Sequence, residues 1–271
     1  MKANLILCSL MAVLTLFSCQ KDNIEFDNNK TGQLKLKFDH IVNGKTSTLK
    51  NSQYSNSFKE TYNIDLLKYY VSNIKLTDDK GKVYTVPKKE SFFLIDASNS
   101  ESLFPKFKIP EGNYTNLEFI LGVDSATSIL PKEDRTGVLD IEGNDMYWSW
   151  NSGYIFFKME GESPASKNAN KRYAYHIGLF GGYDPAKPTK NNLRTISIDL
   201  KKAGIATVQE GLSSDIHLIV DLGKVMDGPN KIKINEFSTV MVSGPNDLIA
   251  NNYSGMFTHD HTHNFQKIAN E

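Results

Sequence analysis

The chain has 271 residues, and its 31 lysines and arginines balance its 31 aspartates and glutamates, so the formal net charge is zero. Proteins that bind nucleic acid carry a basic patch, and the absence of any basic run excludes that class of partner. Both cysteines, Cys8 and Cys19, lie within the first 19 residues. The remaining chain can form no disulfide, and about 240 residues are enough to bury a core without one.

The first 18 residues have the pattern of a bacterial secretion signal. Lys2 supplies a positive start, residues 5–17 are mostly apolar, and Leu-Phe-Ser directly precedes Cys19. This order is typical of lipoproteins, and it predicts cleavage before Cys19 and attachment of lipid such as palmitate to its thiol. A transmembrane anchor is excluded, because crossing a bilayer needs about 20 apolar residues. We therefore expect an outer-membrane lipoprotein of the bacterial cell envelope, held to the membrane through Cys19.

Residues 19–30 are polar and poor in apolar anchors, which predicts a flexible tether between the lipid and the folded domain. The Gln-Lys-Asp that follows Cys19 resembles the export tag of certain Gram-negative surface lipoproteins. That resemblance implies a domain exposed on the cell surface. A charged tether without a targeting signal is the alternative interpretation.

Apolar and polar residues alternate along much of the chain that follows, which predicts half-buried strands. Turn signals such as Asn43-Gly44 separate these runs at intervals suited to antiparallel sheets. The sequence therefore predicts one all-β domain over residues 31–271, an antiparallel β-sandwich with long loops at 162–171 and 183–192 and a short helix within 245–257. The clearest alternating runs are residues 34–38, 69–76, 114–120 and 196–200.

The most biased segment is residues 147–161, which holds both tryptophans, Trp148 and Trp150. Alternate residues of a strand share a face, so these two rings are expected on the same side of a sheet. They could fill the core, frame a site, or form an exposed stacking platform together with Tyr154.

Histidines are the best candidates for metal chemistry, because imidazole suits copper and zinc. In an extended backbone His259, His261 and His263 lie on one face about 6.6 Å apart, so two of them could share one metal ion. A harmless terminal segment is the alternative. His40, His176 and His217 are dispersed. Each alone is interpreted as a hydrogen-bonded structural residue, although His176 follows the aromatic strand by one loop and should lie near Trp148 or Trp150.

Carboxylates between residues 124 and 145 are a second group of candidates. Oxygen ligands in a loop suit calcium, but the spacing matches no calcium motif, so a solvated acidic loop is the simpler interpretation. The chain also lacks the Gly-x-Ser-x-Gly, His-Glu-x-x-His and phosphate-loop patterns. No enzyme activity is therefore expected. The carboxylates in question are Asp124, Asp134, Asp140, Glu142 and Asp145.

Several separated motifs occur together in order along the chain. They are Gly-Val-Asp-Ser at 122–125, Gly-Val-Leu-Asp at 137–140, Met-Tyr-Trp-Ser-Trp-Asn-Ser-Gly-Tyr at 146–154 and Tyr-His-Ile-Gly at 175–178. With Phe-Asp-His at 38–40 and Asp-His-Thr-His at 260–263, this set resembles the MbnP-like copper-binding domain family.

The resemblance implies a secreted or surface β-rich protein that binds copper. In some relatives an oxidised tryptophan, kynurenine, joins histidines as a ligand, and a partner haem enzyme performs the oxidation. In this chain Trp148 or Trp150 would be the residue to modify, although the chain lacks the cysteine pair of the methanotroph members. We therefore expect a copper-binding lipoprotein that captures or transfers the metal, with ligands from His176 and His40 or from His259, His261 and His263. A structural or glycan-binding surface lipoprotein is the alternative.

Overall fold

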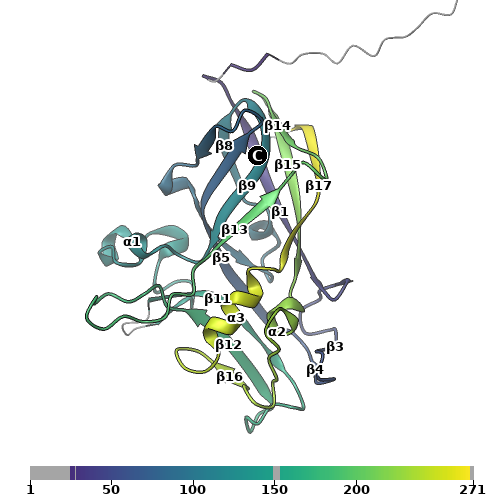
Figure 1. The fold of residues 1–271 in the computed structure, drawn as a ribbon, viewed down its shortest axis with the longest axis vertical. Helices are drawn as coiled ribbons and strands as arrows, with labels where there is room; N and C mark the ends of the chain where they lie inside the picture. Colours follow the sequence, from purple (N-terminus) through teal and green to yellow (C-terminus); the bar gives the residue numbers. More distant parts are fainter. Residues whose placement is uncertain (1–24, 28, 149–152, 269–271) are drawn as a thin grey trace, which may run out of the picture.

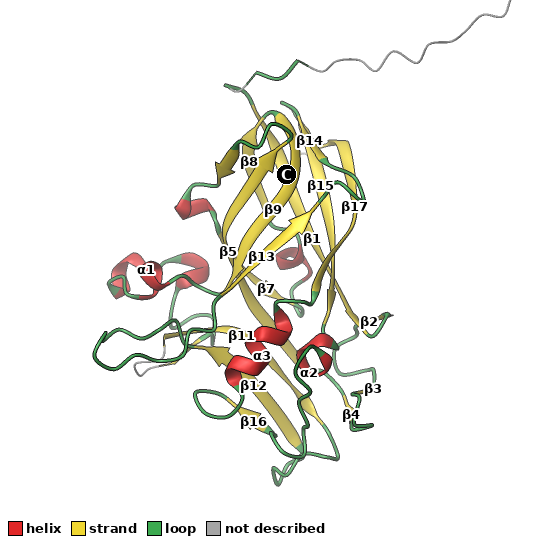
Figure 2. Ribbon diagram, viewed as in Figure 1, coloured by secondary structure: helices red, strands yellow, loops and turns green. Residues whose placement is uncertain are grey.

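The computed structural model describes residues 25–27, 29–148 and 153–268. The predicted signal at 1–18, the lipidation residue Cys19, most of the tether and Trp150 lie outside these residues. Strands dominate, and the few helices are short (Figures 1 and 2). Within the described residues, no helix is long and apolar enough to cross a membrane.

A five-stranded sheet forms one layer of the domain. It runs in the order β17-β15-β1-β2, and β8 also pairs with β1. Its strands are β1 (Thr31–Val42), β2 (Lys45–Thr46), β8 (Lys106–Pro110), β15 (Leu212–Asp221) and β17 (Phe257–Lys267).

A ten-stranded sheet forms the other layer, in the order β13-β9-β5-β11-β12-β16 with four short strands paired alongside. The strands on the main path are β5 (Leu66–Asp78), β9 (Gly112–Leu121), β11 (Gly153–Glu162), β12 (Arg172–Gly178), β13 (Arg194–Asp199) and β16 (Thr239–Val240). The short strands are β6 (Val83–Thr85), β7 (Phe92–Asp96), β10 (Tyr147–Trp148) and β14 (Ala206–Val208).

The remaining elements are small. A separate hairpin joins β3 (Tyr54–Ser55) to β4 (Thr61–Tyr62). The α-helices are α1 (Ser125–Ser128), α2 (Lys224–Asp227) and α3 (Asn246–Tyr253), and α3 packs against α2 and β12 (Figure 1). Four single 3₁₀ turns cover Lys88–Glu90, Ser100–Leu103, Lys132–Asp134 and Gly137–Leu139.

The main core lies between the two sheets, as the alternating pattern predicts. Phe38 of β1 meets Tyr69 of β5 and Phe119 of β9, with ring centroids 6.1 and 6.3 Å apart. Alternate residues of β1 and β15 point inward and are fully buried, which leaves the intervening polar residues on the outer face of the five-stranded sheet. Burial of large apolar side chains contributes about 1.5–3 kcal/mol each.

A second apolar cluster lies on the other side of the ten-stranded sheet and accounts for the aromatic run. Trp148 is 5% exposed and Tyr154 is fully buried, beside Tyr70, Phe156 and Phe180. Because β5 and β11 are covered on both faces here, their residues are buried continuously and do not alternate.

The predicted all-β sandwich with long loops and a short C-terminal helix is confirmed. One detail differs, because the sheets are not purely antiparallel: β1 runs parallel to β15, and β12 runs parallel to β16. Parallel neighbours need a long connection. Here nearly all strands of the ten-stranded sheet lie between β1 and β15 in sequence, so local periodicity cannot reveal that these two strands pair.

Candidate metal site

Three histidines meet on the outer face of the five-stranded sheet. His217 of β15 pairs directly with His261 of β17, and His263 follows two residues later on the same face. One ligand nitrogen from each ring lies within 4.8 Å of the others. The ring centroids are 4.3 Å apart for His217 and His261, 5.0 Å for His217 and His263, and 4.6 Å for His261 and His263. We call these three residues the histidine triad.

The hydrogen bonds of His261 fix which of its nitrogens faces the triad. Its Nδ1 lies 2.9 Å from Oδ2 of Asp260. A carboxylate only accepts, so Nδ1 carries the proton and donates it. In the neutral ring the lone pair is then on Nε2, which lies 3.0 Å from Nε2 of His263. A carboxylate that orients a histidine in this way is the usual outer-shell partner of a metal ligand.

The electrostatic surroundings keep His217 in the form that binds metal. Burial lowers the pKa of its imidazole below the ordinary value, and the charges of His261 and Lys37 lower it further. A neutral imidazole is the metal-binding form, since a proton and a metal ion compete for the same lone pair. His217 and His261 are half-buried and His263 is exposed, so the triad opens to solvent on one side.

The donor set fits a transition-metal ion. Ligand nitrogens about 2.0–2.1 Å from one tetrahedral ion lie roughly 3.3 Å from each other. The Nε2 atoms of His261 and His263 are close to that spacing at 3.0 Å, and all three ligand nitrogens lie within 4.8 Å of one another. Among the described residues, no other group of three or more histidine, cysteine or acidic side chains converges in this way. The carboxylates considered for calcium do not come together. Asp124 caps α1 and pairs with Lys88, and Glu142 pairs with Lys132.

The expectation that His259, His261 and His263 share one face is wrong for His259. The register shifts between His217 and Leu218, so that His261 lies opposite His217 while His259 lies opposite the inward-facing Leu218. This β-bulge turns His259 to the other side of the strand. There its Nε2 lies 2.9 Å from the Thr262 hydroxyl, and burial lowers the pKa of the ring.

His40 is placed away from the triad. It ends the inner run of β1, and its Nε2 lies 2.9 Å from the hydroxyl of the buried Tyr69, with which it also makes an edge-to-face ring contact. Burial lowers the pKa of His40 to about 4. This environment is that of a structural histidine held by a tyrosine, as its isolated position in the sequence indicates.

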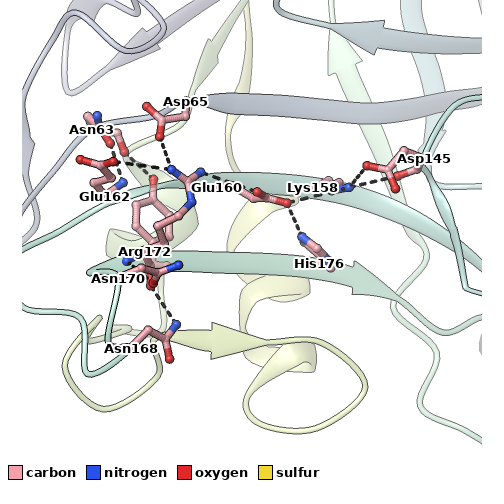
Figure 3. A network of polar contacts seen from close by, with 11 residues as sticks. Asn63, Asp65, Asp145, Lys158, Glu160, Glu162, Asn168, Asn170, Arg172 and His176 are labelled. Atoms are coloured by element: carbon pink, nitrogen blue, oxygen red, sulfur yellow. Dashed lines mark hydrogen bonds and ion pairs between the residues drawn. The ribbon is translucent and has the colours of Figure 1, made fainter.

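His176 also lies apart, within a network of charges on β11 and β12 (Figure 3). Its Nε2 lies 2.7 Å from Oε1 of Glu160. The same carboxylate oxygen is 3.8 Å from Nζ of Lys158, a buried lysine that also lies 2.5 Å from Oδ2 of Asp145. Arg172 reaches Oε2 of Glu160 at 3.8 Å. Burial lowers the pKa of His176, while the hydrogen bond to Glu160 opposes that shift.

The aromatic strand does border the strand of His176, as expected. Gly178 of β12 packs so closely on Trp148 that an added Cβ would come within 2.7 Å of the indole Cζ3. Trp148 and Tyr154 are both buried, so these two rings form no exposed platform for a glycan. The structure therefore favours packing as their role.

Sequence reasoning assigned His217 to the sheet surface without joining it to the C-terminal histidines. The available signal was its strand pattern, in which Ile216, Leu218 and Val220 face one side and His217 faces the other. The missing information was that β17 pairs with β15, because the two segments are about 40 residues apart in sequence and their register includes two bulges.

Similarity to known proteins extends over most of the chain. A family model described as MbnP matches residues 31–242. Among solved structures, MbnP from Methylosinus trichosporium is similar with a TM-score of 0.55 and 17% identity, over 76% of this chain and 80% of that chain. At this identity the structural likeness concerns the fold alone. No curated protein matches the chain. His217 lies inside the matched residues, whereas His261 and His263 lie beyond them.

Proposed function

Because the chain belongs to the MbnP family, we propose that it is an envelope lipoprotein that binds copper at the histidine triad for capture or transfer of the metal. The observation that carries this proposal is the convergence of three imidazoles within 4.8 Å. Nitrogen ligands of this kind suit copper and zinc, and copper forms the tightest complexes of the divalent first-row metals.

The position of the triad suits exchange of the metal with other molecules. It lies on the outer face of the sheet with His263 exposed, so a competing ligand from a donor or acceptor can approach without unfolding the domain. A site buried inside the core would be open to a competing ligand only after part of the domain had unfolded. Attachment through Cys19 and residues 19–30 would keep the domain at the membrane while it exchanges metal.

The decisive experiment measures bound metal in the natively produced full-length protein, purified without a histidine tag. We expect about one copper per chain for the wild type and none for the His217→Ala, His261→Ala, His263→Ala triple variant. His176→Ala is the matched control, because it removes a sheet-surface histidine outside the triad, and it should keep its copper. Equal copper in the triple variant and the wild type would refute the site.

Intact-mass analysis of the same sample tests the other parts of the proposal. Lipid on Cys19 would appear as an acylated mature mass that begins at residue 19. Oxidation of a tryptophan by a haem enzyme would appear as a further mass change in the fragment that contains Trp148 and Trp150. Trp148 is 5% exposed, so an enzyme could not touch its ring directly in this conformation.

A further inference from the structure

A carboxylate stands beside the histidine triad on the same face of the same sheet. Asp215 pairs with His263, and the next outward pair along the two strands is His217 with His261. Paired side chains on one face have Cβ atoms about 4.5–5.5 Å apart, and successive pairs on that face follow about 6.6 Å further along the strand. Asp215, His217, His261 and His263 thus occupy the four corners of one small rectangle.

The ladder around these four residues is regular, and it is bounded by irregularities on both sides. Register shifts occur between Ser213 and Asp215 and again between His217 and Leu218. Bulges of this kind bend a strand and re-aim its side chains, and they are common next to functional sites. Between the two shifts, residues 215–217 of β15 pair regularly with residues 261–263 of β17, and these two short segments carry Asp215 and the three histidines.

Asp215 is buried and charged, and its present partner is a cation. The residue is 6% exposed, its Oδ1 accepts a hydrogen bond of 2.6 Å from the Ser213 hydroxyl, and its Oδ2 pairs with Nζ of Lys35 on β1. Lys35 lies opposite Asp215 in the parallel register. The next lysine of β1, Lys37, lies opposite His217 but pairs with Asp39 at 2.9 Å. Lys35 is therefore the cation that holds the carboxylate, whose oxygens lie outside the cluster of three histidine nitrogens.

We propose that Asp215 is the fourth ligand of the triad site and that its carboxylate stays paired with Lys35 until a metal ion replaces the ammonium group. With this carboxylate as a ligand, the site takes a divalent ion, Cu(II) or Zn(II), in preference to Cu(I). This inference rests on the proposed metal function and specifies the ion. Imidazole nitrogens and carboxylate oxygens are both zinc ligands, and protein zinc sites are usually tetrahedral. A carboxylate oxygen is a harder ligand than a thiolate or thioether, which are the ligands that select Cu(I).

The carboxylate stays paired with a cation throughout the exchange, and the local charge rises by one because a divalent ion replaces a singly charged ammonium group. In the metal-free protein the carboxylate is neutralised by one ammonium group. In the metal form the ion replaces that group, and Lys35, whose side chain is 27% exposed, turns to solvent. Lys35 thus competes with the metal, and its removal should tighten metal binding while it destabilises the metal-free protein, because a buried carboxylate would lose its partner.

The test uses the full-length protein without a histidine tag and titrates Zn(II), Cu(II) and Cu(I) against chelators of known affinity. Asp215→Asn should weaken Zn(II) and Cu(II) binding by about 10- to 100-fold, at least the loss that follows removal of an outer-shell partner. Its affinity for Cu(I) should change by less than about threefold, since an amide oxygen replaces a ligand that the soft ion does not prefer. Lys35→Gln should tighten Zn(II) binding several-fold, and it should have no effect in the Asp215→Asn background.

Thermal unfolding in the presence of a chelator shows whether each variant folds. If Asp215→Asn does not fold, the Zn(II) affinity of Lys35→Gln still tests the proposal. Tighter Zn(II) binding by Lys35→Gln supports the exchange of Lys35 for the metal ion, and unchanged binding overturns it. Wild-type affinity of folded Asp215→Asn for both divalent ions would overturn the inference and leave the triad intact. Wild-type affinity of His263→Ala for every ion would instead refute the proposed function.

Discussion

Histidines stand on the outward faces of both sheets, but their surroundings are different. On the ten-stranded sheet, His176 is held by Glu160 and accompanied by the cations Lys158 and Arg172 (Figure 3). On the five-stranded sheet, His217, His261 and His263 face one another. The Nε2 of His176 is already engaged by Glu160 within a network of ion pairs, whereas in the triad a metal ion would meet converging lone pairs. The comparison shows that the neighbours of a histidine decide its chemistry more than its place on a strand.

The comparison predicts its largest effect for single substitutions of a triad histidine. His261→Ala should weaken copper binding about 1,000-fold, because loss of even an outer-shell partner costs about 10- to 100-fold. The change in affinity for His176→Ala should stay within twofold. Competition titration with a chromophoric chelator measures both. A similar loss of copper affinity in His261→Ala and His176→Ala would show that both histidines contribute to copper binding and that the two regions do not differ in this respect.

His40 provides a second, buried example of a histidine satisfied by the protein. Burial lowers its folded-state pKa to about 4 from the ordinary value of 6.5. The unfolded chain therefore takes up the proton first as the pH falls. The free energy of unfolding should therefore decrease between pH 6.5 and 4, by about 3 kcal/mol in total. His40→Gln should lose this part of the pH dependence. Urea unfolding at pH 7 and at pH 4.5 measures it, and identical pH profiles for the variant and the wild type would contradict the assignment.

Asp260 tests whether the triad is organised by its surroundings. It accepts the hydrogen bond from Nδ1 of His261 at 2.9 Å, which directs Nε2 toward the triad. Asp260→Asn should weaken copper binding about 10-fold, at the lower end for an outer-shell partner because both side chains are exposed to solvent. Asp134→Asn, which removes an exposed carboxylate of the Lys132–Asp134 turn, is the control. Equal affinities for the two variants would mean that Asp260 has no orienting role.

Glu160 should produce the smallest effect, and one confined to the other region. Glu160 raises the pKa of His176 through its hydrogen bond and its charge, against the lowering by burial. Glu160→Gln should therefore move the pKa of His176 further below its ordinary value and leave copper affinity at the triad unchanged. Proton NMR of the imidazole across pH 4–8 measures the shift. A rise in the pKa would show that another group controls His176.

Local patterns were sufficient to predict the class of fold. The alternation at 34–38 and 196–200 gives half-buried strands, and the run at 245–257 gives the C-terminal helix α3. The aromatic run at 147–161 was harder to interpret, because β11 is buried on both faces. A strand covered on both faces has no alternation of apolar and polar residues, so its sequence does not show which side chains face the main core.

The site could be predicted only in part. The alternation of His261 and His263 correctly suggested two imidazoles on one face, but the third ring comes from His217, whose position opposite them depends on long-range strand pairing. The bulge that turns His259 inward is equally invisible, since it is a property of the register between β15 and β17. Such registers are set by packing of the whole sheet and by the turns at its ends.

The position of β17 at the edge of its sheet has a consequence for the order of assembly. His217 and His261 come together only through the pairing of β15 with β17, so the triad forms only after this long-range pairing is complete. Under the proposed function, metal binding would therefore report that the edge strand has paired with its sheet.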